Sequence, residues 1–349
     1  MSLLSSVPVE VLEQIFRYIL FSRHRQPIAL LQTNRLINEI CSPMLHADLM
    51  FSSTIQLNLF AAQCRLSAPP RTFSLSLPGA VVDPEVFDHL HRALGHCLQC
   101  FPDPAKLQLH SMRLCLNSHP MNAEALLRAF SFIDPFEFEW TSPDPDHHFS
   151  ICIVPQVAES LFECFTSWTR LHHLKLCRLS FPSGLGSGDT TGPTLSSALC
   201  TTLQPGEDLP IINDVNIDRT SGRVQPLPYL HTIELSQVIF LDPAEVARIA
   251  CAPSLARTLR RLSVVDAYQD SIWGPRVRLS DVESALRRHS ELIHDIDACK
   301  IGENRVDELH IDGGERLRYL HSNLIRLREI VRCEAKIDRI MGGDRADMK

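Results

Sequence analysis

Short stretches in which apolar and polar residues alternate recur along this chain of 349 residues, and a helical pattern follows each of them. Alternation with a period of two predicts a strand with one buried face. Strands that alternate with helices run parallel in one sheet, because each helix returns the chain to the end where the next strand starts. We therefore expect an α/β fold. The predicted strands centre on residues 73–75, 107–109, 136–138, 174–176, 233–235, 262–264 and 309–311.

Most of these strands also have an aliphatic residue three positions before their first apolar residue. The clearest copy, residues 171–176 with the sequence LHHLKL, resembles the L-x-x-L-x-L core of the leucine-rich-repeat family. The short strands favour a solenoid over a doubly wound sheet, which would show longer aliphatic runs. The resemblance implies a βα solenoid with parallel strands, irregular because its copies lie farther apart than in that family. The family's Asn or Cys position holds other residues, such as Leu179 and Val238, so we expect no buried side-chain ladder.

Two segments interrupt this pattern. An insertion at about residues 182–226 begins with the stretch 182–193, which holds four of the chain's 14 glycines and is predicted to be flexible. The segment at about residues 315–340 has leucines at helical spacing, at positions 317, 320, 324 and 327. This spacing predicts one amphipathic helix that caps the last repeat.

The first fifty residues predict three short helices, over residues 7–20, over residues 28–40 and from Pro43 to Phe51. The opening VPVEVLEQIF and the second segment, residues 29–40, resemble the F-box family. Val7 stands where that family usually has Leu, and Met44-Leu45 stands where many members have Trp. Both changes replace one apolar residue with another.

The F-box resemblance implies docking onto the Skp-type adaptor of a cullin-based ubiquitin ligase. An apolar helix face suits this role because it can fill a groove on a partner. The alternative is that this face packs against the rest of the chain, as most amphipathic helix faces do. By position, the residues that face the adaptor or shape that face are Pro8, Leu12, Ile15, Phe16 and Ile19.

Charge and composition argue against several classes of protein. The 34 Lys and Arg against 41 Asp and Glu give a net charge of −7, so we expect no nucleic-acid partner. No apolar run reaches the roughly 18 residues of a membrane span, so we expect no membrane partner. The 12 cysteines are scattered singly, and acidic residues interrupt the apolar N-terminal segment. These features favour a reducing compartment, the cytoplasm and/or the nucleus.

A zinc-dependent enzyme centred on residues 89–115 is the least favoured alternative. Cys97 and Cys100 have the spacing of a zinc knuckle, but no second pair of this kind exists, and Cys97 matches the buried stripe of a predicted helix. Further candidate ligands nearby are His89, His91, His96, His110 and Cys115. We expect no cofactor, no bound metal and no catalytic residue.

These observations divide the chain into an F-box-like helical domain, residues 1–52, and a leucine-rich-repeat-like array, residues 53–349. The resemblance implies the substrate-recognition subunit of a Skp–cullin–F-box ubiquitin ligase, a non-catalytic protein. Its partners would be the Skp-type adaptor, through it a cullin, and a protein substrate that the sequence does not identify. The alternative is a leucine-rich-repeat interaction scaffold with no ligase role.

Overall fold

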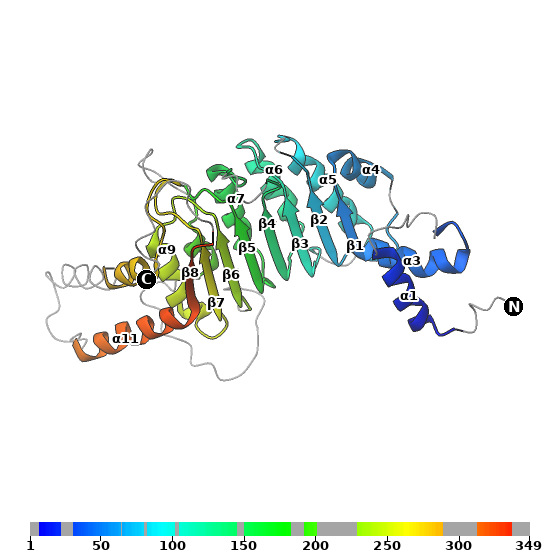
Figure 1. Ribbon diagram of the computed structural model, residues 1–349. Coiled ribbons are helices and arrows are strands. Elements are labelled where there is room, and N and C mark those ends of the chain that lie inside the picture. Colours follow the sequence, from blue (N-terminus) through cyan, green and yellow to red (C-terminus); the bar gives the residue numbers. More distant parts are fainter. Residues whose placement is uncertain are drawn as a thin grey trace.

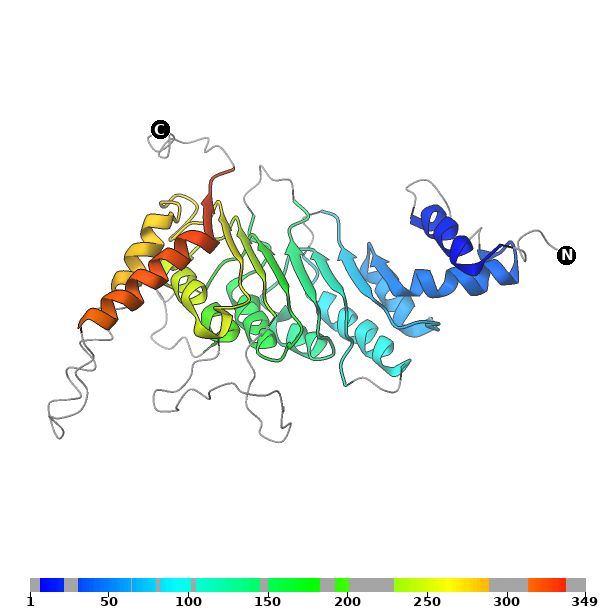
Figure 2. The same cartoon turned by 90° about the horizontal axis from the view of Figure 1, so that it is seen from below.

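The computed structural model describes residues 7–21, 31–63, 65–79, 82–101, 105–144, 150–182, 192–200, 229–288 and 313–336. These residues form one eight-stranded, all-parallel sheet whose strands lie in chain order, which confirms the predicted α/β class. Figures 1 and 2 show the helices that follow the strands along one face of the sheet, while α1 and α3 lie beyond β1. The strands are β1 Asp48–Phe51, β2 Thr72–Ser76, β3 Ser111–Cys115, β4 Glu137–Thr141, β5 His173–Cys177, β6 Thr232–Ser236, β7 Arg261–Val265 and β8 Val331–Glu334.

The helices connect these strands in turn. None of the described helices combines the length and the apolar character that a membrane-spanning helix needs. Residues 279–288 are also helical, and Pro253–Leu255 forms a 3₁₀ turn. The labelled helices are α1 Val9–Phe21, α3 Arg35–Ala47, α4 Thr54–Gln63, α5 Val86–Gln99, α6 Asn122–Phe130, α7 Pro155–Phe165, α8 Leu195–Leu199, α9 Pro243–Cys251 and α11 Gly313–Ile330.

The core lies between the sheet and the helices that follow the strands. Strands β2 to β7 each contribute two side chains to it, and the strand register aligns these side chains in two rows. All twelve are at most 2% exposed, and burying one side chain of this size contributes about 1.5–3 kcal/mol. The rows are Phe73, Met112, Phe138, Leu174, Ile233 and Leu262, and then Leu75, Leu114, Trp140, Leu176, Leu235 and Val264.

Four of the predicted strands, those at 73–75, 174–176, 233–235 and 262–264, are confirmed as β2, β5, β6 and β7. The strand predicted at 136–138 starts one residue later and extends to Thr141. The strand predicted at 107–109 is wrong, because β3 starts at Ser111 and Leu107 forms only an isolated bridge with Ile133. The prediction at 309–311 lies outside the described residues.

The N-terminal helices differ from the prediction. The predicted second helix is interrupted before residue 35, because the Asn34 side chain accepts a hydrogen bond from the Leu36 amide at 2.8 Å and caps the start of α3. The helix predicted from Pro43 to Phe51 is also wrong. Pro43 lies inside α3, and the last four residues of that span form β1, which pairs with β2. The sheet therefore begins within residues 1–52.

The helix predicted at about residues 315–340 is correct only in its first part. Helix α11 ends at Ile330, and β8 follows at once and pairs with β7. The Arg326 guanidinium donates to the carbonyl oxygens of Ala250, Leu255 and Leu259 at 2.9–3.3 Å. These hydrogen bonds join α11 to the end of α9 and to the segment that follows it. Residues 337–340 lie outside the described part of the chain.

Buried polar side chains follow three neighbouring strands. Arg178, Gln237 and Asp266 come directly after β5, β6 and β7, are at most 6% exposed, and have positive φ angles of 56°, 53° and 49°. The Arg178 Nε donates to the Gln237 Oε1 at 2.6 Å, which links two of these positions across the sheet. The positions named in the sequence, such as Leu179 and Val238, hold buried apolar side chains. The buried polar residues lie one position earlier in each connection.

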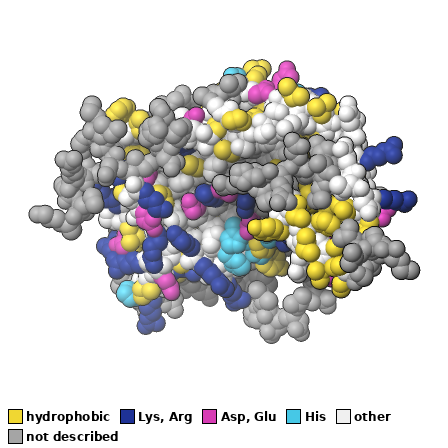
Figure 3. Space-filling model, turned by 45° about the vertical axis from the view of Figure 1, so that its right-hand side comes forward, with side chains coloured by type: hydrophobic (Ala, Val, Ile, Leu, Met, Phe, Trp, Pro, Cys, Tyr) yellow, Lys and Arg dark blue, Asp and Glu magenta, His cyan; other side chains and the backbone are white. Residues whose placement is uncertain are grey.

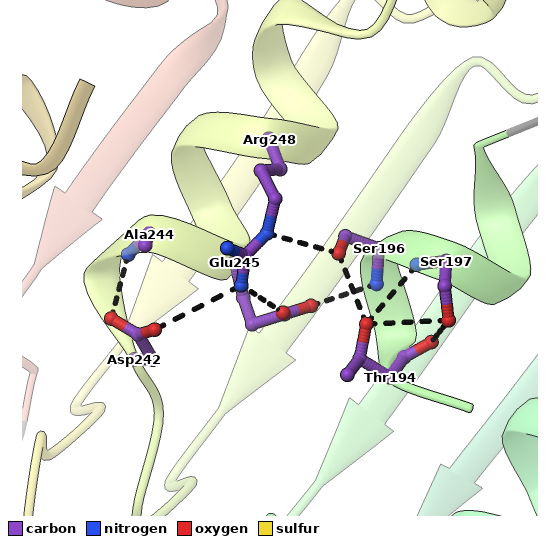
Figure 4. A network of polar contacts seen from close by, with 7 residues as sticks. All are labelled: Thr194, Ser196, Ser197, Asp242, Ala244, Glu245 and Arg248. Atoms are coloured by element: carbon purple, nitrogen blue, oxygen red, sulfur yellow. Dashed lines mark hydrogen bonds and ion pairs between the residues drawn. The ribbon is translucent and has the colours of Figure 1, made fainter. Parts of the chain in front are cut away.

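Within the predicted insertion, the structure describes residues 182 and 192–200, which include α8. Figure 4 shows how α8 is joined to α9. The buried Glu245 carboxylate accepts a hydrogen bond from the Ser196 amide at 2.8 Å and pairs with Arg248. The Arg248 Nε in turn donates to the Ser196 hydroxyl at 3.3 Å. A buried carboxylate at the start of α8 thus satisfies an amide that has no partner within its own helix.

Acidification is expected to weaken this fold through His46, at the end of α3. Its Nδ1 accepts a hydrogen bond from the Ser67 amide at 3.0 Å, and burial lowers the pKa of this imidazole below 6.5. The pKa of His231 is also lowered, by burial and by the neighbouring His172. Below pH 6.5 the unfolded chain therefore binds protons that the folded chain does not, and folding stability decreases as the pH falls toward the folded-state pKa values.

Chemical denaturation monitored by circular dichroism between pH 7.5 and 5 measures this effect. Asp144 and Glu283 have lowered pKa values, but their contributions change mainly below about pH 5, at the lower limit of this window. The variant His46→Gln keeps an acceptor for the Ser67 amide and is expected to lose less stability on acidification. An equal pH dependence in the two proteins would contradict the role of His46.

Candidate protein-interaction surfaces

Helix α1 starts at Val9, directly after Pro8, whose carbonyl oxygen accepts hydrogen bonds from the amides of Val11 and Leu12 at 3.1 and 3.2 Å. One apolar stripe of this helix is buried. Leu12, Phe16 and Leu20 are 4–8% exposed. They form a small core, separate from that of the sheet, with three side chains of α3, namely Ile37, Cys41 and Met44. This core fixes α1 against α3.

A second apolar stripe of α1 faces outward. Val11, Ile15 and Tyr18 follow the helical spacing of four and three residues and are 43%, 47% and 80% exposed. Val9, in the first turn, is also exposed. Figure 3 shows that hydrophobic side chains gather on the part of the surface that carries the N-terminal elements. Exposed apolar side chains grouped in this way are typical of protein–protein contacts.

The five residues predicted to face or shape the adaptor surface therefore divide into two groups. Pro8 and Ile15 are exposed, whereas Leu12 and Phe16 are buried against α3. Ile19 is partly buried and packs against the same core. Val9, Val11 and Tyr18 were not predicted. For Val11 and Tyr18 a signal was present in the sequence, because positions 11, 15 and 18 also follow a helical spacing, of four and three residues.

The open face of the sheet carries a row of charged side chains of alternating sign. Strand register places Arg113, Glu139, Lys175 and Glu234 side by side on β3 to β6. The Lys175 Nζ lies 2.8 Å from a Glu139 oxygen, and the Arg113 Nε lies 3.6 Å from the other. This hydrogen bond to Glu139 raises the pKa of Lys175. The row borders a shallow depression of about 250 Å³, which His173 and Thr232 also line.

The candidate zinc ligands do not form a metal site in the described residues. No three His, Cys, Asp or Glu side chains are grouped closely enough there to hold a metal ion. Cys97 is fully buried in α5, and the Cys100 Sγ lies 3.8 Å from the His96 Nε2. His89 contacts Arg92 through its Nδ1. The two remaining candidates, His110 and Cys115, lie just before β3 and at its end.

His91 and His96 instead line a cavity of about 380 Å³ between α4 and α5, together with Asn58 and Phe132. The His91 ring stacks on the Phe132 ring at 4.8 Å.

Burial raises the pKa of the Cys164 and Cys200 thiols to about 12, so both stay protonated at neutral pH. Protonated, buried thiols are poor nucleophiles.

The chain was compared with models of known protein families, with curated proteins and with solved structures, and none of the three comparisons found a match.

Proposed function

We propose that this chain is the target-recognition subunit of a Skp–cullin–F-box ubiquitin ligase. In this role α1 and α3 act as an F-box and bind the Skp-type adaptor, and the strand–helix array acts as an irregular leucine-rich-repeat solenoid that holds a target protein. The chain makes and breaks no bond itself. It raises the local concentration of target lysines near a conjugating enzyme that is bound elsewhere in the complex.

The exposed stripe Val11, Ile15 and Tyr18 is the observation that carries this proposal. An apolar stripe on a helix that already buries its other stripe has no packing role within the described chain. It has the spacing of a helix that fills a groove on a partner. The alternating charges of the open face, with exposed and partly exposed side chains, supply polar contacts for a target.

Aspartates at positions 11 and 15 test the docking role. The double variant Val11→Asp with Ile15→Asp is expected to weaken binding of a purified Skp-type adaptor about a hundredfold, because two buried interface contacts are replaced by desolvated charges. Isothermal titration calorimetry with the full chain measures the affinity. The control is Ile55→Asp with Leu59→Asp, which changes two exposed apolar residues of α4 in the same way and should leave binding unchanged.

The outcome separates the ligase from the alternative scaffold. Loss of binding only in the α1 variant supports the ligase subunit. If the unmodified chain does not bind the adaptor, the ligase proposal fails and the interaction scaffold becomes the preferred function. Leu12→Asp is unsuitable for this test because it would disrupt the core between α1 and α3.

A further inference from the structure

Among the residues that the structure describes, the two edges of the sheet differ in charge. In the parallel sheet all connections that enter strands β2 to β7 from a helix lie at one edge, which we term the amino-end edge. Its described residues are 65–71, 105–110, 131–136, 166–172, 229–231 and 252–260. They include one carboxylate, Asp134, which is buried and accepts hydrogen bonds from the Thr169 and Arg170 amides. The six cationic residues are Arg65, Arg71, Lys106, Arg170, Arg257 and Arg260.

The opposite edge, where the strands lead into helices, has the reverse balance. Its described connections, after β1 to β7, contain the three cations Arg178, Arg276 and Arg278. They contain twice as many carboxylates, namely Asp83, Glu85, Asp144, Asp242, Asp266 and Asp270. The cations at the amino-end edge are therefore a local feature of a chain whose net charge is −7.

Aromatic and imidazole rings fill the middle of the amino-end edge. The residues directly before strands β2 to β7 form one row. Backbone hydrogen bonds join several neighbours in this row; for example, the His172 amide donates to the Phe136 carbonyl oxygen at 2.8 Å, and the His231 amide donates to the His172 carbonyl oxygen at 2.8 Å. The rings of His110 and Phe136 stack at 5.2 Å, and those of Phe136 and His172 at 3.8 Å. Tyr229, which is 53% exposed, stacks on His172 at 5.3 Å.

The ends of this row are cationic. Arg71 and Arg260 precede β2 and β7, and both are exposed. Five strand spacings of about 4.8 Å separate them, or about 24 Å, which about seven residues of extended chain would span. A group of histidine side chains with Lys and Arg side chains beside it is visible at the surface in Figure 3.

We propose that the amino-end edge binds an extended acidic segment of a partner protein. Carboxylates of the segment pair with the exposed arginines at the two ends, and its apolar or aromatic side chains pack on Tyr229 and the partly exposed rings between them. This inference deepens the proposed function, since it states the chemistry of the target that the array holds. It does not depend on adaptor docking by α1.

The neighbouring open face favours a protein over a nucleic acid. Glu137, Glu139 and Glu234 lie on the strands next to the amino-end edge. They would repel the evenly charged backbone of DNA or RNA along its length. A protein segment can place its carboxylates at the arginines alone and uncharged or basic side chains near these glutamates. Charge complementarity thus selects a segment of mixed composition.

Fluorescence polarisation with the full chain and a labelled Glu/Tyr peptide of about ten residues tests the proposal, because such a peptide spans the row. A Gln/Tyr peptide of equal length and a single-stranded oligonucleotide serve as comparisons. The Glu/Tyr peptide is expected to bind at least about tenfold more tightly than either. The double variant Arg71→Glu with Arg260→Glu should weaken its binding about tenfold or more.

The control variant Arg288→Glu with Arg318→Glu changes two exposed arginines elsewhere, alters the net charge equally, and should change binding less than about twofold. Equal loss in both double variants, tighter binding of the oligonucleotide, or no binding of the Glu/Tyr peptide would overturn the proposal. The Val11→Asp, Ile15→Asp variant should bind the peptide normally, and the Arg71→Glu, Arg260→Glu variant should bind the adaptor normally. A failure of this inference is thus distinct from a failure of the ligase proposal.

Discussion

Replacing Trp140 with alanine is expected to lower the free energy of unfolding by about 4 kcal/mol, the largest loss among the single substitutions considered. Trp140 lies on β4, is fully buried, and is placed by the strand register between Leu114 of β3 and Leu176 of β5. Its ring lies 5.5 Å from that of Phe87 on α5. Alanine would therefore leave a cavity where strands and helices meet, and the surrounding side chains can only partly fill it.

The indole N–H of Trp140 makes a separate contribution. It donates a hydrogen bond to the Leu116 carbonyl oxygen at 3.0 Å. Trp140→Phe keeps most of the ring but removes this donor, and a loss of about 1–2 kcal/mol is expected. Urea denaturation monitored by circular dichroism compares the two variants with the unmodified chain. Equal losses for Phe and Ala would show that the hydrogen bond, and not the packing, dominates.

Replacing Arg178 with alanine is expected to lower the free energy of unfolding by about 3 kcal/mol, because buried partners would be left without a donor. Arg178 is 1% exposed and donates to the Gln237 Oε1 at 2.6 Å and to the Ser142 hydroxyl at 2.9 Å. Its charge also contributes to the lowered pKa of Asp144, after the larger effect of the Ser150 hydrogen bond. The substitution would disturb the connections after three neighbouring strands.

Arg178→Lys provides the matched comparison. Lysine keeps the charge and the length of the side chain but cannot donate in two directions from one planar group. We expect it to retain about half of the stability that Arg178→Ala loses. The same denaturation experiment measures both variants. A midpoint for Arg178→Ala close to that of the unmodified chain would rule out a structural role for this buried arginine.

The parallel sheet could be predicted from the sequence, because alternation of apolar residues is a local signal. It succeeded where two aliphatic residues flank one polar residue, as in Leu174-Lys175-Leu176. It failed at β3, where Met112 and Leu114 are the buried pair and Leu109 is the aliphatic residue three positions before Met112. Leu107 and Leu109 have the same spacing. Pairing with β2 and β4 decides which of the two residue pairs lies in the strand, and this pairing cannot be predicted from the local sequence alone.

The first and last strands could not be predicted, for a related reason. β1 and β8 each have four residues and follow a helix without a turn. Their sequences, DLMF and VRCE, extend the helical patterns of α3 and α11. Pairing with β2 and β7 overrides the local preference, and such tertiary effects commonly outweigh intrinsic propensity.

The α1 stripe was predicted only in part. Apolar spacing identified the helix, and both of its apolar stripes fit that spacing. Which stripe is buried depends on α3, whose Ile37, Cys41 and Met44 cover Leu12 and Phe16.

The charges of the amino-end edge were not predicted because they lie in separate connections, far apart in the sequence. The net charge of the whole chain does not show that cationic residues lie together at one edge of the sheet.

The sequential order of the strands has a consequence for how this architecture can change in length. Each strand pairs only with its neighbours in the chain, so duplication or deletion of one strand–helix unit would leave the remaining pairs in register. The connection from β5 to β6 is more than twice as long as that from β6 to β7, yet both pairs match over five residues. Each added unit would move α11 about 4.8 Å farther from α1, so the number of units sets the distance between the two ends of the sheet.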